Sequence, residues 1–185
     1  MLLLILGLAA FVLPHLIRRL APGLSESLGP ARKGIVALVS VIGVVLMVIG
    51  YRAADFVPVY EPLAGMGHLN NLLMLVAVYL YGVGGTKGTL HARIRHPMLL
   101  GTLLWAVGHL LVNGDRASVV LFGGLAIWAV GAIVLLNRAG PWARPTGGRG
   151  VKGDLMNLAG TVVLFGLFAG VHIWLGRNPF LGTYG

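Results

Sequence analysis

Three histidines of this chain lie inside long apolar segments: His15, His109 and His172. None of these segments contains an aspartate or a glutamate. Burying an imidazole in hydrocarbon is costly, so a histidine inside a membrane segment is by default a candidate functional residue. Neutral imidazoles are common metal ligands. Histidines without acidic partners therefore suit a bound metal or porphyrin better than a proton-coupled transporter.

His109 is predicted to lie deepest in the membrane. It follows Met98 by eleven residues, which is about 16 Å along a helix and near the middle of a bilayer. His15 follows Pro14 near the cytoplasmic end of its segment, and counting residues along the helices places it about 6 Å closer to the cytoplasm than His109. If both histidines bind one group, helix tilt must absorb this difference in depth.

Each histidine also has a structural interpretation that the sequence leaves open. His109 can bond to a carbonyl group of a neighbouring helix. The others can lie at a membrane interface, where water and head groups provide polar partners: His15 beside Arg18 and Arg19, His172 beside Trp174, and His68 at the start of a helix.

A second candidate site is the segment Arg95-His96-Pro97, which precedes an apolar run. The N-terminus of a helix presents unbonded N–H groups and the positive end of the helix dipole, so it attracts anions. A site of this kind suits a propionate, a phosphate or the carboxylate of a cofactor. The alternative is a basic anchor at the membrane interface.

The segment between these two candidate sites contains small and aromatic residues. Gly101 and Gly108 lie two turns apart, and Gly108 adjoins His109. This spacing leaves room for a flat cofactor, and it also permits close packing of helices. Trp105 lies one turn before His109. Trp128 is expected to face Trp105 from the following helix.

The elements that must position these residues are membrane helices. The chain has 185 residues, of which 57% are hydrophobic and only 10% charged, and its mean hydropathy is +0.90. A soluble domain of this size could not cover its surface with so few charges. We predict one all-α domain over residues 1–185, a polytopic bundle of about six transmembrane helices. The predicted spans are Met1–Ile17, Gly34–Tyr51, Leu69–Val83, Met98–Val112, Ala117–Leu136 and Leu155–Leu175.

The first span lacks a basic segment before it and a small-residue cleavage site, so we expect an uncleaved helix rather than a signal peptide. Eleven of the fourteen cations fall in the first, third and fifth connections: Arg18, Arg19, Arg32, Lys33, Lys87, Arg93, Arg95, Arg138, Arg144, Arg149 and Lys152. By the positive-inside rule these connections are cytoplasmic, and both termini face the periplasm of a bacterial inner membrane. The net charge of +9 then predicts contact with anionic lipid and not with nucleic acid.

The chain has no cysteine. Disulfides, thiolate catalysis, iron–sulfur clusters and covalent c-type haem are therefore excluded. Any haem must be held without covalent attachment, through ligands other than cysteine.

A family resemblance rests on Arg95-His96-Pro97-Met98-Leu99-Leu100-Gly101, followed by Leu104–Asp115. These residues resemble the NnrU family, which includes the plant zeta-carotene isomerase. Weaker matches are Leu13–Leu16, Leu121–Gly124 and His172–Gly182, so the resemblance spans nearly the whole chain apart from the loop at 140–153.

The resemblance implies an integral membrane protein with b-type haem. Two histidines proposed as axial ligands in the plant enzyme fall on His15 and His109, with His172 and His68 as fallbacks for the second ligand. Arg18 or Arg95 can pair with the haem propionates. The other residues expected to contact the haem are His96, Gly101, Trp105 and Gly108.

The function implied by the resemblance falls into two classes. One is a cis–trans isomerase that acts on a lipid-soluble polyene such as zeta-carotene. The other is a haem-dependent accessory or sensor protein in the nitrite and nitric-oxide metabolism of denitrification. A further histidine important to the isomerase falls on Trp128 here, which weakens the first class.

The alternative to a haem protein is a membrane methyltransferase. Arg95–Gly101 is also similar to the element of membrane methyltransferases that contacts S-adenosylmethionine. Those enzymes carry an acidic pair beyond this element, and no such pair follows Gly101 here.

Overall fold

The apolar segments fold as helices because a helix satisfies its own backbone hydrogen bonds where water is absent. The computed structural model describes residues 1–181, and in this range it contains α- and 3-10 helices and no β-strand. In chain order the elements are α1 (Leu2–Leu20), α2 (Pro22–Ser27), η1 (Gly29–Ala31), α3 (Arg32–Arg52), α4 (Met66–Thr86), η2 (Thr89–Ala92), α5 (Pro97–Val112), α6 (Arg116–Arg138) and α7 (Gly150–Trp174).

Among the described residues, five helical segments are long and apolar enough to cross a membrane: α1, η1 together with α3, α4, α6 and α7. α5 is also apolar but has only 16 residues, which is about 24 Å of helix. These six helices lie at the six predicted spans, so the predicted all-α membrane bundle is confirmed. Many apolar side chains point outward, among them Ile127 at 76% exposure and Val163 at 69%, as expected for helices that face lipid.

The last helix begins earlier than the predicted span, at Gly150 instead of Leu155. Asp154, whose residue type is common at helix N-caps, lies one turn inside this helix. Its carboxylate accepts hydrogen bonds from the backbone N–H of Thr89 at 2.8 Å and from the hydroxyl of Tyr79 at 3.4 Å. The acid therefore attaches α7 to α4 and η2.

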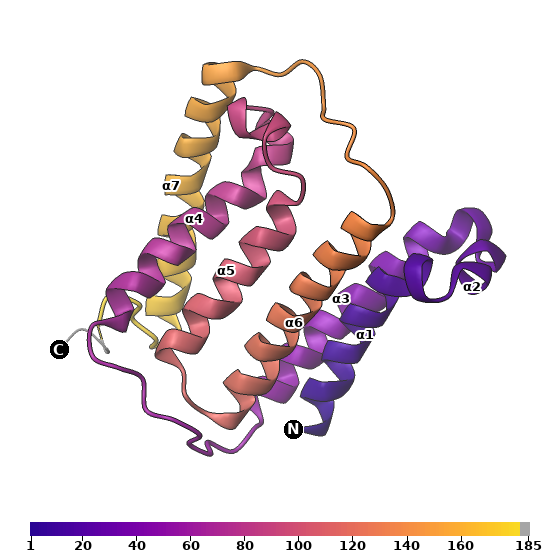
Figure 1. The fold of residues 1–185 in the computed structure, drawn as a ribbon. Coiled ribbons are helices and arrows are strands. Elements are labelled where there is room, and N and C mark those ends of the chain that lie inside the picture. The colour runs from indigo at the N-terminus through magenta and orange to yellow at the C-terminus, as the bar shows by residue number, and fades with distance from the viewer. Residues whose placement is uncertain (182–185) are drawn as a thin grey trace.

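The helices pack in two groups that share α6 (Figure 1). α1 packs along α3, while α4 packs against both α5 and α7, and α6 contacts α5 on one side and α1 on the other. Glycines bring α1 and α3 together, because a Cβ added at Gly7 would meet the backbone of Met47, and one added at Gly43 would lie 2.8 Å from the carbonyl oxygen of Gly7. Close approach through small residues is the usual packing of membrane helices.

Successive spanning helices run in opposite directions, so their connections gather at two ends of the bundle (Figure 1). At the end that we call the basic end, α1, α4 and α6 finish and α3, α5 and α7 begin. The opposite end, which we call the Asp115 end, holds the N-terminus and the last turn of α7. The predicted alternation of basic and weakly charged connections therefore follows the helix order.

The connection between α5 and α6 is a tight turn, Asn113-Gly114-Asp115, made of residue types that favour turns. The Asp115 carboxylate caps α6 by accepting from the backbone N–H of Ser118 at 3.0 Å. The backbone N–H groups of Val59 and Tyr60 donate to the carbonyl of Gly114 at 2.8 and 3.1 Å. Val59 and Tyr60 belong to the connection between α3 and α4. This connection therefore packs over the turn at the end of α5.

Tyr60 strengthens the same contact, because its hydroxyl donates to the carbonyl oxygen of Asn113 at 2.9 Å. Partial burial, and then the negative charge of Asp115, raises the pKa of the Tyr60 hydroxyl. The hydroxyl therefore remains a neutral donor at physiological pH.

Candidate functional site

His109 lies in the last turn of α5, three residues before the helix ends at Val112. Its ring stacks on Phe122 of α6 with the centroids 4.5 Å apart, and the Trp105 ring lies 5.0 Å away. The half-buried imidazole thus belongs to a cluster of three aromatic rings that all contact one another. Counting from Met98 placed His109 near the middle of the bilayer. Because α5 has only 16 residues, His109 lies close to the Asp115 end instead.

One ring nitrogen of His109 already has a partner. Its Nδ1 lies 2.9 Å from the carbonyl oxygen of Trp105. A carbonyl oxygen only accepts, so Nδ1 carries the proton and Nε2 keeps its lone pair in the neutral ring. This tautomer is the one in which Nε2 can bind a metal.

His172 approaches His109 from α7. The two ring centroids lie 6.5 Å apart, and both residues belong to the last turns of their helices at the Asp115 end. His172 has the same tautomer, because its Nδ1 lies 2.7 Å from the carbonyl oxygen of Phe168. Two imidazoles that share one metal have centroids about 6 Å apart when each metal–nitrogen distance is about 2 Å. The observed spacing is close to this value.

His15 lies elsewhere, on α1. Its Nδ1 is 2.6 Å from the carbonyl oxygen of Phe11, so it repeats the tautomer of the other two histidines. Its ring contacts Phe11 and the edge of Trp128, with centroid distances of 4.5 and 5.4 Å. Trp128 therefore faces α1. We had expected it to face Trp105 instead.

The structure does not bring His15 and His109 together. They pack on Trp128 and Phe122 of α6, which are six residues apart and so differ in depth by about 9 Å. The direction of this difference agrees with the sequence prediction, which placed His15 closer to the basic end. The role of His15 as a ligand stays a prediction.

Arg95 and His96 hold the start of α5 against the end of α6. The Arg95 guanidinium donates to the carbonyl oxygens of Leu136 at 3.0 Å and Gly140 at 2.8 Å. The Nε2 of His96 donates to Oδ1 of Asn137 at 3.0 Å. The Arg95 guanidinium satisfies backbone carbonyl groups that a helix end leaves unbonded, and a cation is favourable there.

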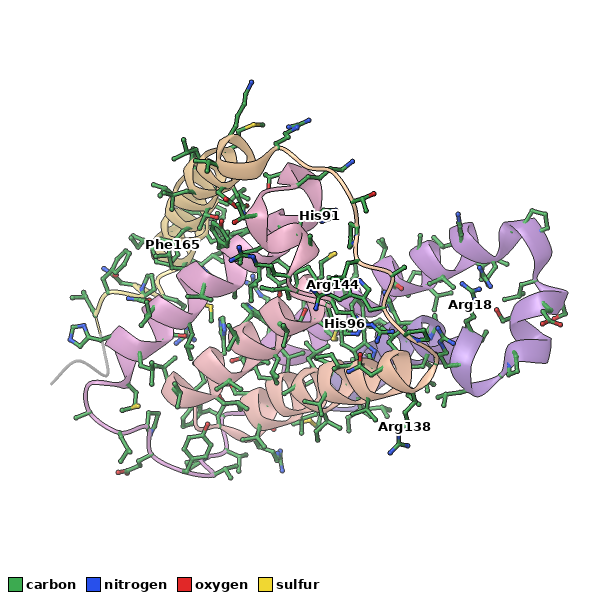
Figure 2. The ribbon with its side chains drawn as sticks, turned by 45° about the horizontal axis from the view of Figure 1, so that its top comes forward. Arg18, His91, His96, Arg138, Arg144 and Phe165 are labelled. Carbon is green, nitrogen blue, oxygen red and sulfur yellow. The ribbon has the colours of Figure 1, made fainter. Side chains whose placement is uncertain are left out.

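The basic residues predicted to contact the cofactor lie far from His109. Figure 2 shows His96 beside the end of α6 and Arg18 in the α1–α2 region, both toward the basic end. His96 precedes His109 by thirteen residues, which is about 20 Å along α5. The predicted contacts of Arg18, Arg95 and His96 with a cofactor remain predictions, and they do not converge on His109.

Gly101 and Gly108 face α4. A Cβ at Gly101 would lie 3.0 Å from the carbonyl oxygen of Ala77, and one at Gly108 would lie 2.6 Å from the Met74 methyl group. The geometry therefore fits the packing interpretation of these glycines, and their contact with a cofactor stays a prediction. Trp105 lies on another face of α5, where its ring is 5.0 Å from that of Phe122.

Two polar groups near these residues were not predicted. Oδ1 of Asn70 on α4 is buried opposite Gly108, and Nε1 of Trp128 is buried beside His15; neither has a hydrogen-bond partner among the described residues. An asparagine pair in an apolar helix, Asn70-Asn71, is the signal that sequence analysis could have used. His68, the other fallback ligand, is exposed in the first turn of α4.

Comparison with known proteins identifies a family for this chain. The model of the NnrU protein family matches residues 3–179. No curated protein and no solved structure matches the chain. Because the family model covers nearly the whole bundle, from α1 past the last turn of α7, the chain belongs to the NnrU family.

Proposed function

We propose that the chain is a membrane protein that binds b-type haem through His109, with His172 as the second axial ligand. The observation that carries this proposal is the pair of imidazoles 6.5 Å apart, each with Nδ1 bonded to a carbonyl oxygen four residues earlier. Histidines that bind metals usually donate their other ring N–H to a carbonyl or carboxylate, which fixes the tautomer and the ring orientation.

The surroundings of His109 suit a haem ligand. Phe122 stacks on one face of the imidazole and Trp105 contacts it at a tilted angle, and these two contacts restrict the orientation of the ring. Imidazole is an established axial ligand of haem iron, and the chain has no thiolate to compete for the metal. Bound haem with two imidazole ligands would supply a one-electron carrier, and a small ligand such as nitric oxide would bind only by displacing one of the imidazoles.

The alternative second ligand is His15, which the family resemblance implies. It has the same Nδ1 contact with a backbone carbonyl as the other two histidines. His172 is preferred because it comes from a helix that reaches the His109 ring, whereas the His15 ring packs on Trp128.

Within the family we propose a haem-dependent accessory or sensor role in nitrogen-oxide metabolism rather than polyene isomerisation. The specific reason is Trp128, an indole at the position of a histidine that the isomerase requires. An indole cannot bind iron or transfer a proton at neutral pH, because its nitrogen is only a donor. We further propose that the protein resides in a bacterial inner membrane with the basic end in the cytoplasm.

Methyl transfer has less support. The guanidinium of Arg95 and the ring of His96 are engaged by α6, at the positions where S-adenosylmethionine would be bound. Asp115, the first acid after this segment, lies at the opposite end of the bundle.

The test is an absorption spectrum combined with product analysis. Protein expressed with ample haem is expected to show a Soret band and a low-spin spectrum, and to leave the isomer composition of added zeta-carotene unchanged. A preparation without a Soret band would refute haem binding. Isomer conversion that disappears in His109→Ala would replace the accessory role with the isomerase.

A further inference from the structure

A cleft separates α1 from α3 at the basic end. The close glycine contacts between these helices end at Gly43, and beyond them the two helices bound a space of about 410 Å³. Pro14 and Ser40 lie on its walls. The cleft is open, and both helices expose apolar side chains to the bilayer around it, such as Leu13 at 60% and Leu38 at 62% exposure.

Cations and apolar side chains both line the cleft. Arg18, Arg32 and Lys33 supply three cations, and none of the described residues that line the space carries a carboxylate. Ile17, Val36 and Ala37 form the apolar wall. A ligand that fills this space must carry both an anion and hydrocarbon.

The cations of α3 stand where helix electrostatics disfavours them. Arg32 and Lys33 begin α3, and the first turn of this helix contains no acid. A helix N-terminus carries positive partial charge, so cations there are destabilising unless an anion compensates them. Arg32 is held in place, because its guanidinium donates to the hydroxyl of the buried Ser25 at 2.9 Å. Glu26, the acid nearest in sequence, does not line the cleft.

We infer that this cleft binds an anionic phospholipid. The lipid phosphate lies among Arg18, Arg32 and Lys33, and one acyl chain lies against Ile17, Val36 and Ala37. Polybasic groups next to a membrane span attract anionic lipids, and the cleft turns this general attraction into a single site. His15, the alternative haem ligand, also lines the cleft. The site is separate from a haem held by His109 and His172, because these two residues lie near the other end of the bundle.

The experiment is native mass spectrometry of the full chain in a neutral detergent, with phosphatidylglycerol, phosphatidylcholine or inorganic phosphate added. We expect one tightly bound phosphatidylglycerol, and no comparable adduct with phosphatidylcholine or with phosphate. The double variant Arg32→Gln/Lys33→Gln is expected to bind phosphatidylglycerol about tenfold more weakly or worse. Removing cations from a helix N-terminus should not unfold the protein, and circular dichroism checks this.

Two controls separate the cleft from a general surface effect. Arg149→Gln/Lys152→Gln removes the same charge from another basic connection and should keep the adduct. Ala37→Trp fills the apolar wall without changing charge and should lose it. Equal loss in both charge variants, retention in Ala37→Trp, or equal binding of free phosphate would overturn the proposal. So would loss of haem from Arg32→Gln/Lys33→Gln with lipid binding intact, because the cleft would then hold a haem propionate.

Discussion

The imidazole of His109 on α5 lies 6.5 Å from that of His172 on α7, measured between ring centroids. The two histidines are far apart in sequence, and their helices meet through α4, which packs against both. Because both residues belong to last turns, the pair lies near the Asp115 end. A metal held there is close to one face of the membrane.

The contact between α1 and α3 predicts a strong effect at Gly50. An alanine Cβ at this position would overlap the backbone of Leu4, which has no freedom to move aside. We expect Gly50→Ala to lower the free energy of unfolding by about 1–3 kcal/mol, as overpacking does. Gly160→Ala is the matched control, because a Cβ there meets no atom within 4 Å. Thermal unfolding in detergent measures both, and equal midpoints for the two variants would contradict the packing described here.

The contact of Arg95 with α6 predicts a loss of stability that charge alone does not explain. Arg95→Ala leaves two carbonyl groups at the end of α6 without their donor. We expect a loss of about 2 kcal/mol in the free energy of unfolding. Arg93→Ala removes an exposed cation from the same connection and should have little effect. A larger effect at Arg93 than at Arg95 would be inconsistent with this role.

The charge asymmetry predicts the orientation in the membrane. A reporter inserted at Gly147, between α6 and α7, should be active only in the cytoplasm. A reporter fused after Gly176, past the last turn of α7, should be active only in the periplasm. The reverse pattern would show that the basic end faces outward.

The engaged side chains at the start of α5 predict no binding of S-adenosylmethionine. Calorimetry with the purified protein should detect no heat of binding at micromolar concentrations of the compound. Micromolar binding that Arg95→Ala abolishes would instead support the methyltransferase alternative.

The helices could be predicted well because their signal is local. Runs such as Ala117–Leu136 contain no charged residue and only one polar side chain, and Asn113-Gly114-Asp115 is a strong turn signal. The boundary of α7 was harder, because Asp154 is a good capping residue that the structure uses in a tertiary contact with Thr89. That contact depends on a neighbour far away in sequence.

The candidate site was only partly predictable. His109 and Trp105 are neighbours on one helix, so their spacing shows that they lie together. The approach of His172 depends on how α7 packs against α4, and the direction of Trp128 depends on where α1 lies. The spacing of residues along a single segment does not indicate how that segment packs against another helix, so neither contact could be predicted.

We propose that His109 and His172 together hold the iron, and the low-spin spectrum of three single variants prepared with ample haem tests this pairing most directly. His109→Ala should lose most of the haem. His172→Ala should lose haem or leave it five-coordinate and high-spin, while His15→Ala should keep the low-spin spectrum of the parent protein. His91→Ala, in η2 at the basic end, is the control and should change nothing. An unaltered low-spin spectrum in His172→Ala, with its loss in His15→Ala, would contradict the account and assign the second ligand to His15.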